Sequence, residues 1–415
     1  MGSEKRDKAT WPRVRKFFND IHLWLGLASG LIVIVVCFTG TVYVFNTEIR
    51  EMSASHLYRV EAEAGAVALA PDTIVARVES ALGGKVRMVR IPRDGSRTWQ
   101  VAVQKEGEKP APGRRGPGTM YAVNPYTGEV IGNISEYKNG VTEFMRDMFS
   151  LHRWLLLDRI EEPIFGELPN RTLGSYITGT ATIFFTIGVL TGLIIWFPKK
   201  LKNWKQGLKI KWDSNWKRLN HDLHNTLAFY SLIFLFLMGV TGPQWSFPWY
   251  REGLQKTLGT WRAPDAPREK PPRSAFPPEG AQAGNIAFYL EAADEALPYE
   301  GDYAITLPPD STAAVSVTKN RTGFLAPAAG DRLTLDQYSG AVIEKDVFRD
   351  KPLNERIAGS IKALHLGDVY GMFTKILYFF ACLVATTLPI TGTLIWVNKL
   401  KKKKKKARKE AVQVA

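Results

Sequence analysis

Four long apolar stretches constrain this chain more than any other feature of its sequence. Each runs for about 20 residues with almost no charge, the length that a helix needs to cross roughly 30 Å of hydrocarbon at about 1.5 Å per residue. The stretches are Trp24–Phe45, Tyr176–Phe197, Thr226–Trp245 and Met372–Val397. Lys375 lies close to the start of the last one, where we expect its amine to extend to the membrane surface. The pattern predicts an α-helical integral membrane protein with four transmembrane helices.

Basic residues gather in three segments. Segments 1–21, 198–222 and 398–415 together hold 23 Lys and Arg against six Asp and Glu, whereas the rest of the chain holds 32 and 34. Because loops rich in Lys and Arg stay in the cytoplasm, both termini are expected there, and the regions between the first and second and the third and fourth stretches are expected to be exported. The net charge of +15 therefore indicates topology and not a nucleic-acid partner. The run Lys401–Lys406 directly follows a stretch and is interpreted as an anchor at the lipid surface.

These expectations divide the chain into eight parts. They are the N-terminus with the first helix (1–47), an exported domain (48–172), the second helix (173–197), a cytoplasmic loop (198–222), the third helix (223–246), another exported domain (247–364), the fourth helix (365–397) and a polybasic tail (398–415). The N-terminal apolar part is too long for a signal peptide and no A-x-A site follows, so we expect an uncleaved anchor. Cys37 and Cys382 lie inside apolar stretches, which favours packing over metal binding and predicts exported domains without disulfides.

The two exported domains repeat one order of elements. The first is predicted to contain a helix at Pro71–Leu82, strands at Val86–Pro92 and Thr98–Val103, and a hairpin at Met120–Ile131. The second is predicted to contain a helix at Ile286–Ala296, strands at Tyr303–Leu307 and Ala313–Thr318, and a hairpin at Arg332–Ile343. Gly128 and Gly340 stand where each hairpin turn favours positive φ. Pro110–Gly118 and Ala263–Pro278 are interpreted as loops. A duplicated α+β plan of this kind usually places function between the halves.

A threonine-glycine pair lies near the end of every apolar stretch. The pairs are Thr39-Gly40, Thr191-Gly192, Thr241-Gly242 and Thr391-Gly392. Small residues at that depth let helices approach closely. Close packing would explain a single pair, but recurrence at four comparable positions is harder to explain by packing alone.

Five of the six histidines stand next to the apolar stretches, where ionisable side chains usually mark a site. His22, His221 and His224 are at cytoplasmic helix starts, and His152 and His365 precede helices on the exported side. Helix direction pairs a helix-3 histidine with His22 near the cytoplasm, and His152 with His365 near the outer face. Two neutral imidazoles from facing helices are what a six-coordinate b-type haem iron needs, while apolar helix faces hold the porphyrin.

Some histidine assignments remain open. His221 and His224 are three residues apart on neighbouring helix faces, so either could be the ligand; His224 is favoured because it lies deeper. A zinc site at that pair lacks further ligands. His56 is interpreted as a surface residue. Because His152 lies more than 20 residues before the apolar core of its helix, the chain must fold back for this residue to face His365.

These residues resemble the PepSY-associated transmembrane family, specifically the iron-regulated membrane proteins that include ferric-siderophore reductases. The resemblance covers nearly the whole chain and rests on the histidine contexts, the Thr-Gly pairs, and the segments Asn124–Val130, Thr191–Trp196 and Thr391–Trp396. It implies two periplasmic PepSY-like domains, a bacterial inner-membrane location and two haem b groups that pass electrons to a periplasmic ferric siderophore. Under this interpretation the axial ligands of the haem iron are His22, His224, His152 and His365.

Three functions are compatible with this pattern. A haem-dependent ferric-siderophore reductase would need an external donor, either quinol or a cytoplasmic reductase docking near 198–222, and no flavin or NAD fingerprint appears in the sequence. A PepSY binding or regulatory protein without redox activity would leave the histidines unexplained. A transporter would need a polar pathway, which nearly uncharged helices do not offer. Trp245, Trp249 and Tyr250 are interpreted as an interfacial belt in preference to a ligand-stacking site.

Overall fold

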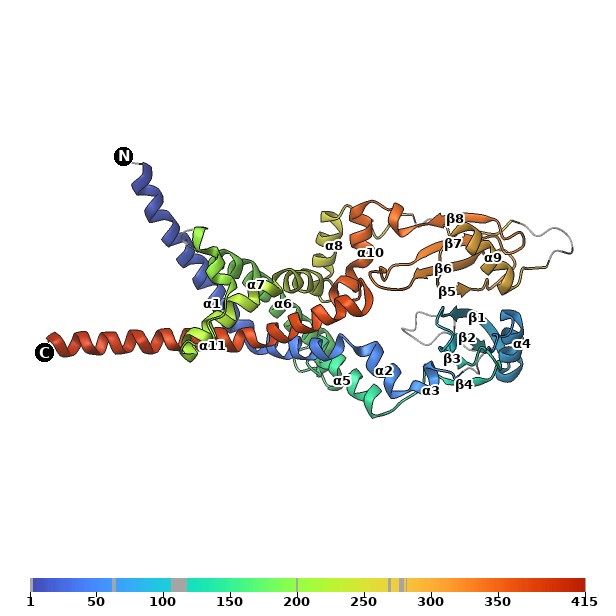
Figure 1. The fold of residues 1–415 in the computed structure, drawn as a ribbon, viewed down its shortest axis with the longest axis horizontal. Helices are drawn as coiled ribbons and strands as arrows, with labels where there is room; N and C mark the ends of the chain where they lie inside the picture. The colour runs from blue at the N-terminus through green and yellow to red at the C-terminus, as the bar shows by residue number, and fades with distance from the viewer. Residues whose placement is uncertain are drawn as a thin grey trace.

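The computed structural model is elongated, with a helical bundle at one end and a β-sheet at the other (Figure 1). It describes residues 3–61, 65–105, 118–198, 201–267, 270–275, 280 and 282–414. Both chain ends lie at the end of the bundle that is far from the sheet (Figure 1). Of the loop predicted at Pro110–Gly118, all residues but Gly118 lie outside the described part of the chain.

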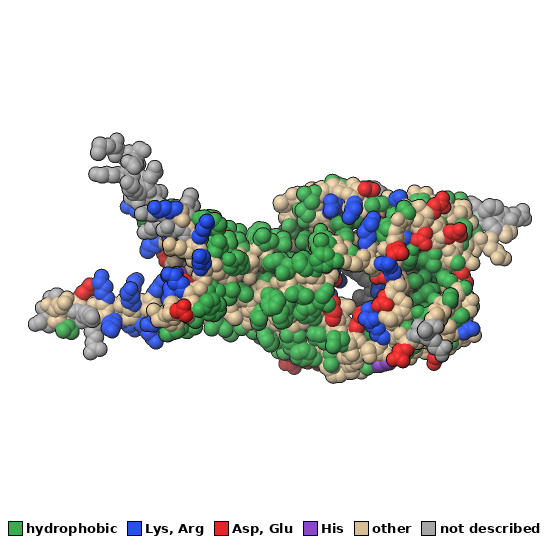
Figure 2. Space-filling model, viewed as in Figure 1, with side chains coloured by type: hydrophobic (Ala, Val, Ile, Leu, Met, Phe, Trp, Pro, Cys, Tyr) green, Lys and Arg blue, Asp and Glu red, His purple; other side chains and the backbone are tan. Residues whose placement is uncertain are grey.

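Four helices in the described part of the chain are long and apolar enough to cross a membrane. They are α1 (Ser3–Tyr43), α6 (Asn170–Trp196), α7 (Trp216–Thr241) with its continuation η3 (Gly242–Trp245), and α11 (Gly371–Val414). Helices α1 and α7 each pack against both α6 and α11. Apolar side chains cover the outside of this bundle (Figure 2), as a lipid-facing surface requires. The predicted stretches overrun the ends of these helices by at most two residues.

Lys375 forms an ion pair near the start of α11. Its side chain is 7% exposed, and its Nζ donates to Glu48 Oε1 at 2.7 Å, with Asp368 Oδ1 at 3.8 Å. Glu48 belongs to α2 (Asn46–Ser53), which follows α1 after two residues. A buried amine needs a counter-charge, and the Glu48 carboxylate provides it. The ion pair therefore joins α11 to α2, which directly follows α1.

Short helices lie at the two ends of the bundle, and some of them connect the bundle to the sheet. They are α3 (Ser55–Tyr58), α5 (Gly140–Trp154), η1 (Leu157–Arg159), η2 (Leu201–Leu208), α8 (Pro248–Thr257), η4 (Phe348–Asp350) and α10 (Leu353–Leu366). Helix α10 contains His365, whereas the sequence predicts that residue 365 begins the fourth transmembrane helix. Helix α5 brings the chain back to α1, and Leu155 and Leu156, both at positive φ, turn it towards α6. The carbonyl of Trp154 approaches Gly174 so closely that an added Cβ would lie 2.2 Å away. The chain therefore does fold back after His152.

The segments between α1 and α6 and between α7 and α11 both contribute to a single antiparallel sheet of eight strands, in the order β4-β3-β2-β1-β5-β6-β7-β8. The strands are β1 (Gly84–Ile91), β2 (Trp99–Lys105), β3 (Thr119–Val123), β4 (Val130–Asn133), β5 (Gly301–Thr306), β6 (Val315–Arg321), β7 (Asp331–Leu335) and β8 (Val342–Asp346). Strands β1 and β5 join the halves, with Met88 opposite Thr306 and Ile91 opposite Tyr303. The two predicted domains are thus one continuous layer, which the sequence analysis did not predict.

Alternation of side chains gives the sheet two different faces. Val89, Val101, Ile305 and Val317 are fully buried in a core covered by the helices α4 (Pro71–Leu82) and α9 (Ile286–Ala296). Both helices begin and end where the sequence predicts, and the predicted strands are confirmed with ends shifted by up to three residues. The opposite face of the sheet is polar and is described further below.

The hairpin turns also confirm the expected backbone. Gly128 has φ of 70° and Gly340 has φ of 68°, in the left-handed region that a residue with a Cβ seldom adopts.

Candidate functional site: two histidine pairs

His22 and His224 face each other at the end of the bundle that carries the chain termini. His22 projects from α1 and His224 from α7, with ring centroids 6.3 Å apart and ring planes at 87°. The Nδ1 atom of His22 lies 2.9 Å from the carbonyl of Gly188 and 3.2 Å from Thr191 Oγ1. The Nδ1 atom of His224 lies 2.8 Å from Thr391 Oγ1.

His152 and His365 form a second pair, at the end of the bundle that faces the sheet. They come from α5 and α10, and their ring centroids are also 6.3 Å apart, with planes at 66°. The Nδ1 atom of His152 lies 2.8 Å from the carbonyl of Val36 and 3.2 Å from Thr39 Oγ1. The Nδ1 atom of His365 lies 3.0 Å from Thr241 Oγ1. Trp245, expected in an interfacial belt, packs its ring 4.9 Å from that of His365.

The four Thr-Gly pairs are the supports of the four histidines. The threonine of each pair contacts an imidazole Nδ1, as described above, and the following glycine leaves room for the same ring. A Cβ added to that glycine would lie 3.2 or 3.3 Å from the imidazole Cε1, for Gly192 against His22, Gly392 against His224, Gly40 against His152 and Gly242 against His365. The sequence revealed the recurrence of these pairs but not this role.

These contacts fix which ring nitrogen carries the proton. Each threonine hydroxyl lies within 2.9 Å of a carbonyl in the preceding turn of its own helix, to which it donates its one proton. The hydroxyl oxygen then accepts from the imidazole Nδ1–H. The carbonyls of Gly188 and Val36 can only accept, which requires the same tautomer. A neutral imidazole with these contacts carries its proton on Nδ1 and leaves Nε2 free to bind a metal ion, as in metal sites where the other ring nitrogen donates to an outer acceptor.

The distance between the rings fits two ligands of one metal ion. A metal–imidazole bond is about 2.0 Å, and a ring nitrogen lies about 1.1 Å from the ring centroid, so two imidazoles on opposite sides of an ion have centroids about 6 Å apart. Both pairs match this value at 6.3 Å. Two axial imidazoles leave the equatorial positions to a porphyrin, whose edges need apolar surroundings. The residues present could therefore hold one haem at each end of the bundle.

The remaining histidines belong to neither pair. His221 is about half exposed, and its ring nitrogens lie 3.1 Å from Asn225 Nδ2, with Asp222 Oδ1 3.6 Å away. His56 is exposed beside the ring of Tyr137. Within the described residues no group of three or more His, Cys, Asp or Glu is placed to hold a metal ion. The geometry thus favours His224 over His221 as the partner of His22.

The site has the internal symmetry of the sequence. Each half of the chain supplies one histidine to each pair, and each histidine is supported by a threonine of its own half. His22 and Thr39 are 17 residues apart on α1, and His224 and Thr241 are 17 residues apart on α7. The equal spacing repeats in both halves, although Thr39 contacts His152 and Thr241 contacts His365, so it does not reveal which histidine each threonine supports.

Fold and site together define a duplicated integral membrane protein, with four spanning helices, one shared extramembrane sheet and two histidine pairs. The family model for the PepSY-associated TM region matches residues 20–399, and the chain belongs to this family. A search of curated proteins gave no match. The family resemblance expected from the sequence is confirmed.

Proposed function

We propose that this protein is a di-haem b oxidoreductase that passes electrons across the bacterial inner membrane and reduces a periplasmic ferric siderophore. The observation that carries the proposal is the presence of two facing imidazole pairs, each 6.3 Å between centroids and each with a threonine hydroxyl at both Nδ1 atoms. Haem bound there supplies reversible one-electron chemistry at its iron. The protein supplies orientation, a fixed tautomer and exclusion of water.

The spacing of the pairs supports a path across the membrane. On α1, His22 belongs to one pair and Val36 contacts the other, and the 14 residues between them span about 21 Å of helix. A hydrocarbon core is roughly 30 Å thick, so the two pairs stand at different leaflets. His22 and His224 would hold one haem and His152 and His365 the other, and haems at these two sites would supply one-electron chemistry at both ends of the bundle.

Charge supports the orientation. The basic segments 1–21, 198–222 and 398–415 all lie at the His22 end of the bundle, which the positive-inside rule assigns to the cytoplasm. The sheet is then periplasmic. A quinol, or a cytoplasmic reductase docked near 198–222, is oxidised, and each electron it releases reduces one chelated Fe(III) to Fe(II). Iron leaves because Fe(II) binds hard oxygen ligands more weakly than Fe(III).

A haem count on purified protein tests the proposal. We expect about two b haems per chain in the wild type by pyridine haemochrome, and one in each of His224→Ala and His365→Ala. His56→Ala, which alters an exposed histidine outside both pairs, should retain both. Wild-type protein that carries no haem after expression in haem-supplied cells would overturn the proposal. It would favour the alternative of a PepSY binding or regulatory protein without redox activity.

A further inference from the structure

The polar face of the sheet encloses a cavity of about 1070 Å³. Its floor comes from side chains that alternate with the core residues along β1, β2, β5, β6 and β7: Met88, Arg90, Gln100, Ala304, Thr306, Ser316, Thr318, Asn320 and Arg332. None of these side chains belongs to the core beneath α4 and α9. This face therefore remains available to a ligand.

The cavity opens between the sheet and the bundle. Figure 2 shows a hollow there, with charged side chains on its rim. On one side Arg97, which lines the cavity, donates to Glu51 of α2 at 2.8 Å. On another side the loop after β6 reaches the start of α11, where Ala328 N donates to the Val369 carbonyl at 2.8 Å. Helices α5 and α10, which carry His152 and His365, lie at the end of the bundle nearer the sheet (Figure 1).

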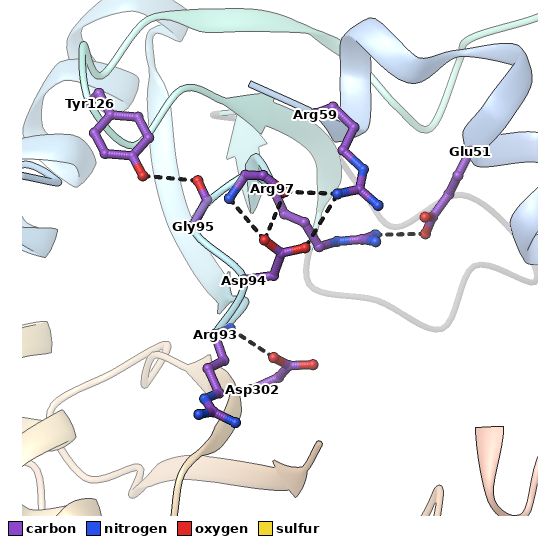
Figure 3. A network of polar contacts seen from close by, with 9 residues as sticks. Glu51, Arg59, Arg93, Asp94, Gly95, Arg97, Tyr126 and Asp302 are labelled. Atoms are coloured by element: carbon purple, nitrogen blue, oxygen red, sulfur yellow. Dashed lines mark hydrogen bonds and ion pairs between the residues drawn. The ribbon is translucent and has the colours of Figure 1, made fainter. Parts of the chain in front are cut away.

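Arginines outnumber carboxylates in the lining. The arginines are Arg90, Arg93, Arg97 and Arg332, and the carboxylates are Asp94 and Asp302. Figure 3 shows that Arg97 is held by Glu51, while Arg59 pairs with Asp94 at 3.3 Å and the Arg93 backbone N–H donates to Asp302. Hydrogen bonds from the Ser96 hydroxyl and backbone lower the pKa of Asp94, so this carboxylate stays charged and remains bound to Ser96 and Arg59.

Two arginines of the lining have side chains without an ion pair to any described residue. The Arg90 side chain is exposed and contacts only the amide of Gln100, at 3.4 Å. The Arg332 side chain is exposed and makes no side-chain hydrogen bond to a described residue, and Asp346, opposite it on β8, pairs with Lys351.

The two arginines stand in one row across the sheet, where Arg90 is opposite Ala304, Ala304 opposite Thr318, and Thr318 opposite Arg332. Three strand spacings separate the two arginine backbones by about 14 Å. The small Ala304 and Thr318 side chains leave the space between them open.

We propose that this cavity is the substrate site, and that the substrate is an Fe(III) chelate with net negative charge, held between Arg90 and Arg332. The inference deepens the proposed function and rests on it. Two guanidinium groups with free donors suit carboxylate or catecholate oxygens at the periphery of such a chelate, since arginine binds planar oxyanions through paired N–H groups. The hydroxyls of Thr306, Ser316 and Thr318 offer further donors on the floor. A positively charged chelate would meet the same two arginines and be repelled.

Binding of redox-inert gallium complexes tests this site on the full-length protein. The probes are the Ga(III) complex of a tricatecholate chelator, which is an anion, and the Ga(III) complex of desferrioxamine B, which is a cation. We expect the anion to bind more tightly. We also expect Arg90→Gln and Arg332→Gln each to weaken its binding about tenfold, and the double variant about a hundredfold, because each removes one charged donor and they lie far apart. Arg349→Gln, an exposed arginine on η4 outside the cavity, should bind as the wild type does.

Unchanged anion affinity in the double variant, or tighter binding of the cationic complex, would overturn the inference. Haem content of the same preparations separates this failure from failure of the proposed function. Protein without haem that still binds the gallium anion through both arginines would overturn the redox proposal and retain the anion site. Protein with two haems whose anion affinity ignores both arginines would overturn only the anion site.

Discussion

Thr391→Val removes one hydrogen-bond acceptor from the His22–His224 pair with little change of shape. The Oγ1 atom of Thr391 accepts from His224 Nδ1 at 2.8 Å, and valine has no oxygen there. Such an outer hydrogen bond makes an imidazole a more basic ligand, which stabilises Fe(III) over Fe(II). A hydrogen bond of this kind contributes about 1 kcal/mol, which corresponds to about 40 mV for one electron. The variant should therefore raise the midpoint potential of one haem by about 40 mV.

A redox titration followed by visible absorbance measures this shift. The second haem should keep its potential, because His152 and His365 are supported by Thr39 and Thr241 and not by Thr391. Haem affinity at the affected pair should also fall, by about tenfold or more, as found when outer-sphere partners of metal ligands are removed.

Thr393→Val is the matched control for this variant. It lies two residues further along α11, is exposed, and donates its hydroxyl to the Pro389 carbonyl at 2.7 Å. Equal potentials for both haems in Thr391→Val, Thr393→Val and the wild type would refute the reasoning, because the threonine would then not act through His224.

Three further substitutions test other parts of the structure. Gly192→Val should lower haem content to one per chain, because its Cβ alone would stand 3.2 Å from His22 Cε1 and the added methyl groups would displace the ring. Lys375→Met should destabilise the protein by about 2 kcal/mol in a thermal melt, because it leaves the partly buried Glu48 carboxylate without its partner. Asp336 keeps a lowered pKa despite burial, which by itself raises it, because backbone N–H groups donate to the carboxylate. Stability should therefore fall in circular-dichroism melts below pH ~4, and Asp336→Asn should reduce that dependence.

Each of these substitutions has a control or a contradicting outcome. Gly253→Val, on α8 outside the bundle and with no atom within 4 Å of an added Cβ, should retain both haems. Lys270→Met, at an exposed position, should melt as the wild type does. For Asp336 the sign is that of a depressed pKa: its contribution is present above the unfolded pKa and is lost as pH falls through the folded one. An identical acid dependence in Asp336→Asn would show that other carboxylates cause it.

Local patterns made most elements predictable from the sequence. Long uncharged stretches of about 20 residues are stable in a membrane as helices, because a helix satisfies its own backbone hydrogen bonds. Helices Pro71–Leu82 and Ile286–Ala296 combine apolar periodicity with clear start and stop residues. The joining of the two halves was not predictable in this way. The pairing of β1 with β5 connects residues more than 200 positions apart, such as Met88 and Thr306, and depends on how the two four-stranded halves of the sheet meet.

The sequence predicted the histidines of the site, but not the threonines and glycines that support them. Position next to the apolar stretches singled out the histidines, because ionisable groups there are costly. Which threonine faces which imidazole depends on the rotation and tilt of neighbouring helices, as for His22 of α1 and Thr191 of α6. The ion pair of Lys375 was not predictable for a related reason, since its counter-charge on Glu48 is 327 residues away in the chain.

The crossed arrangement of the pairs makes both halves of the chain necessary for each pair. His22 and His152 come from the first half and His224 and His365 from the second, so neither half alone completes a single site. Helix α1 carries a ligand of one pair and the supporting Thr39 of the other, 17 residues away, and α7 repeats this with the same interval. At about 1.5 Å per residue this interval fixes the two pairs about 25 Å apart along both helices. An insertion within either interval would shift both pairs relative to each other, so the length of each helix is constrained by both sites at once.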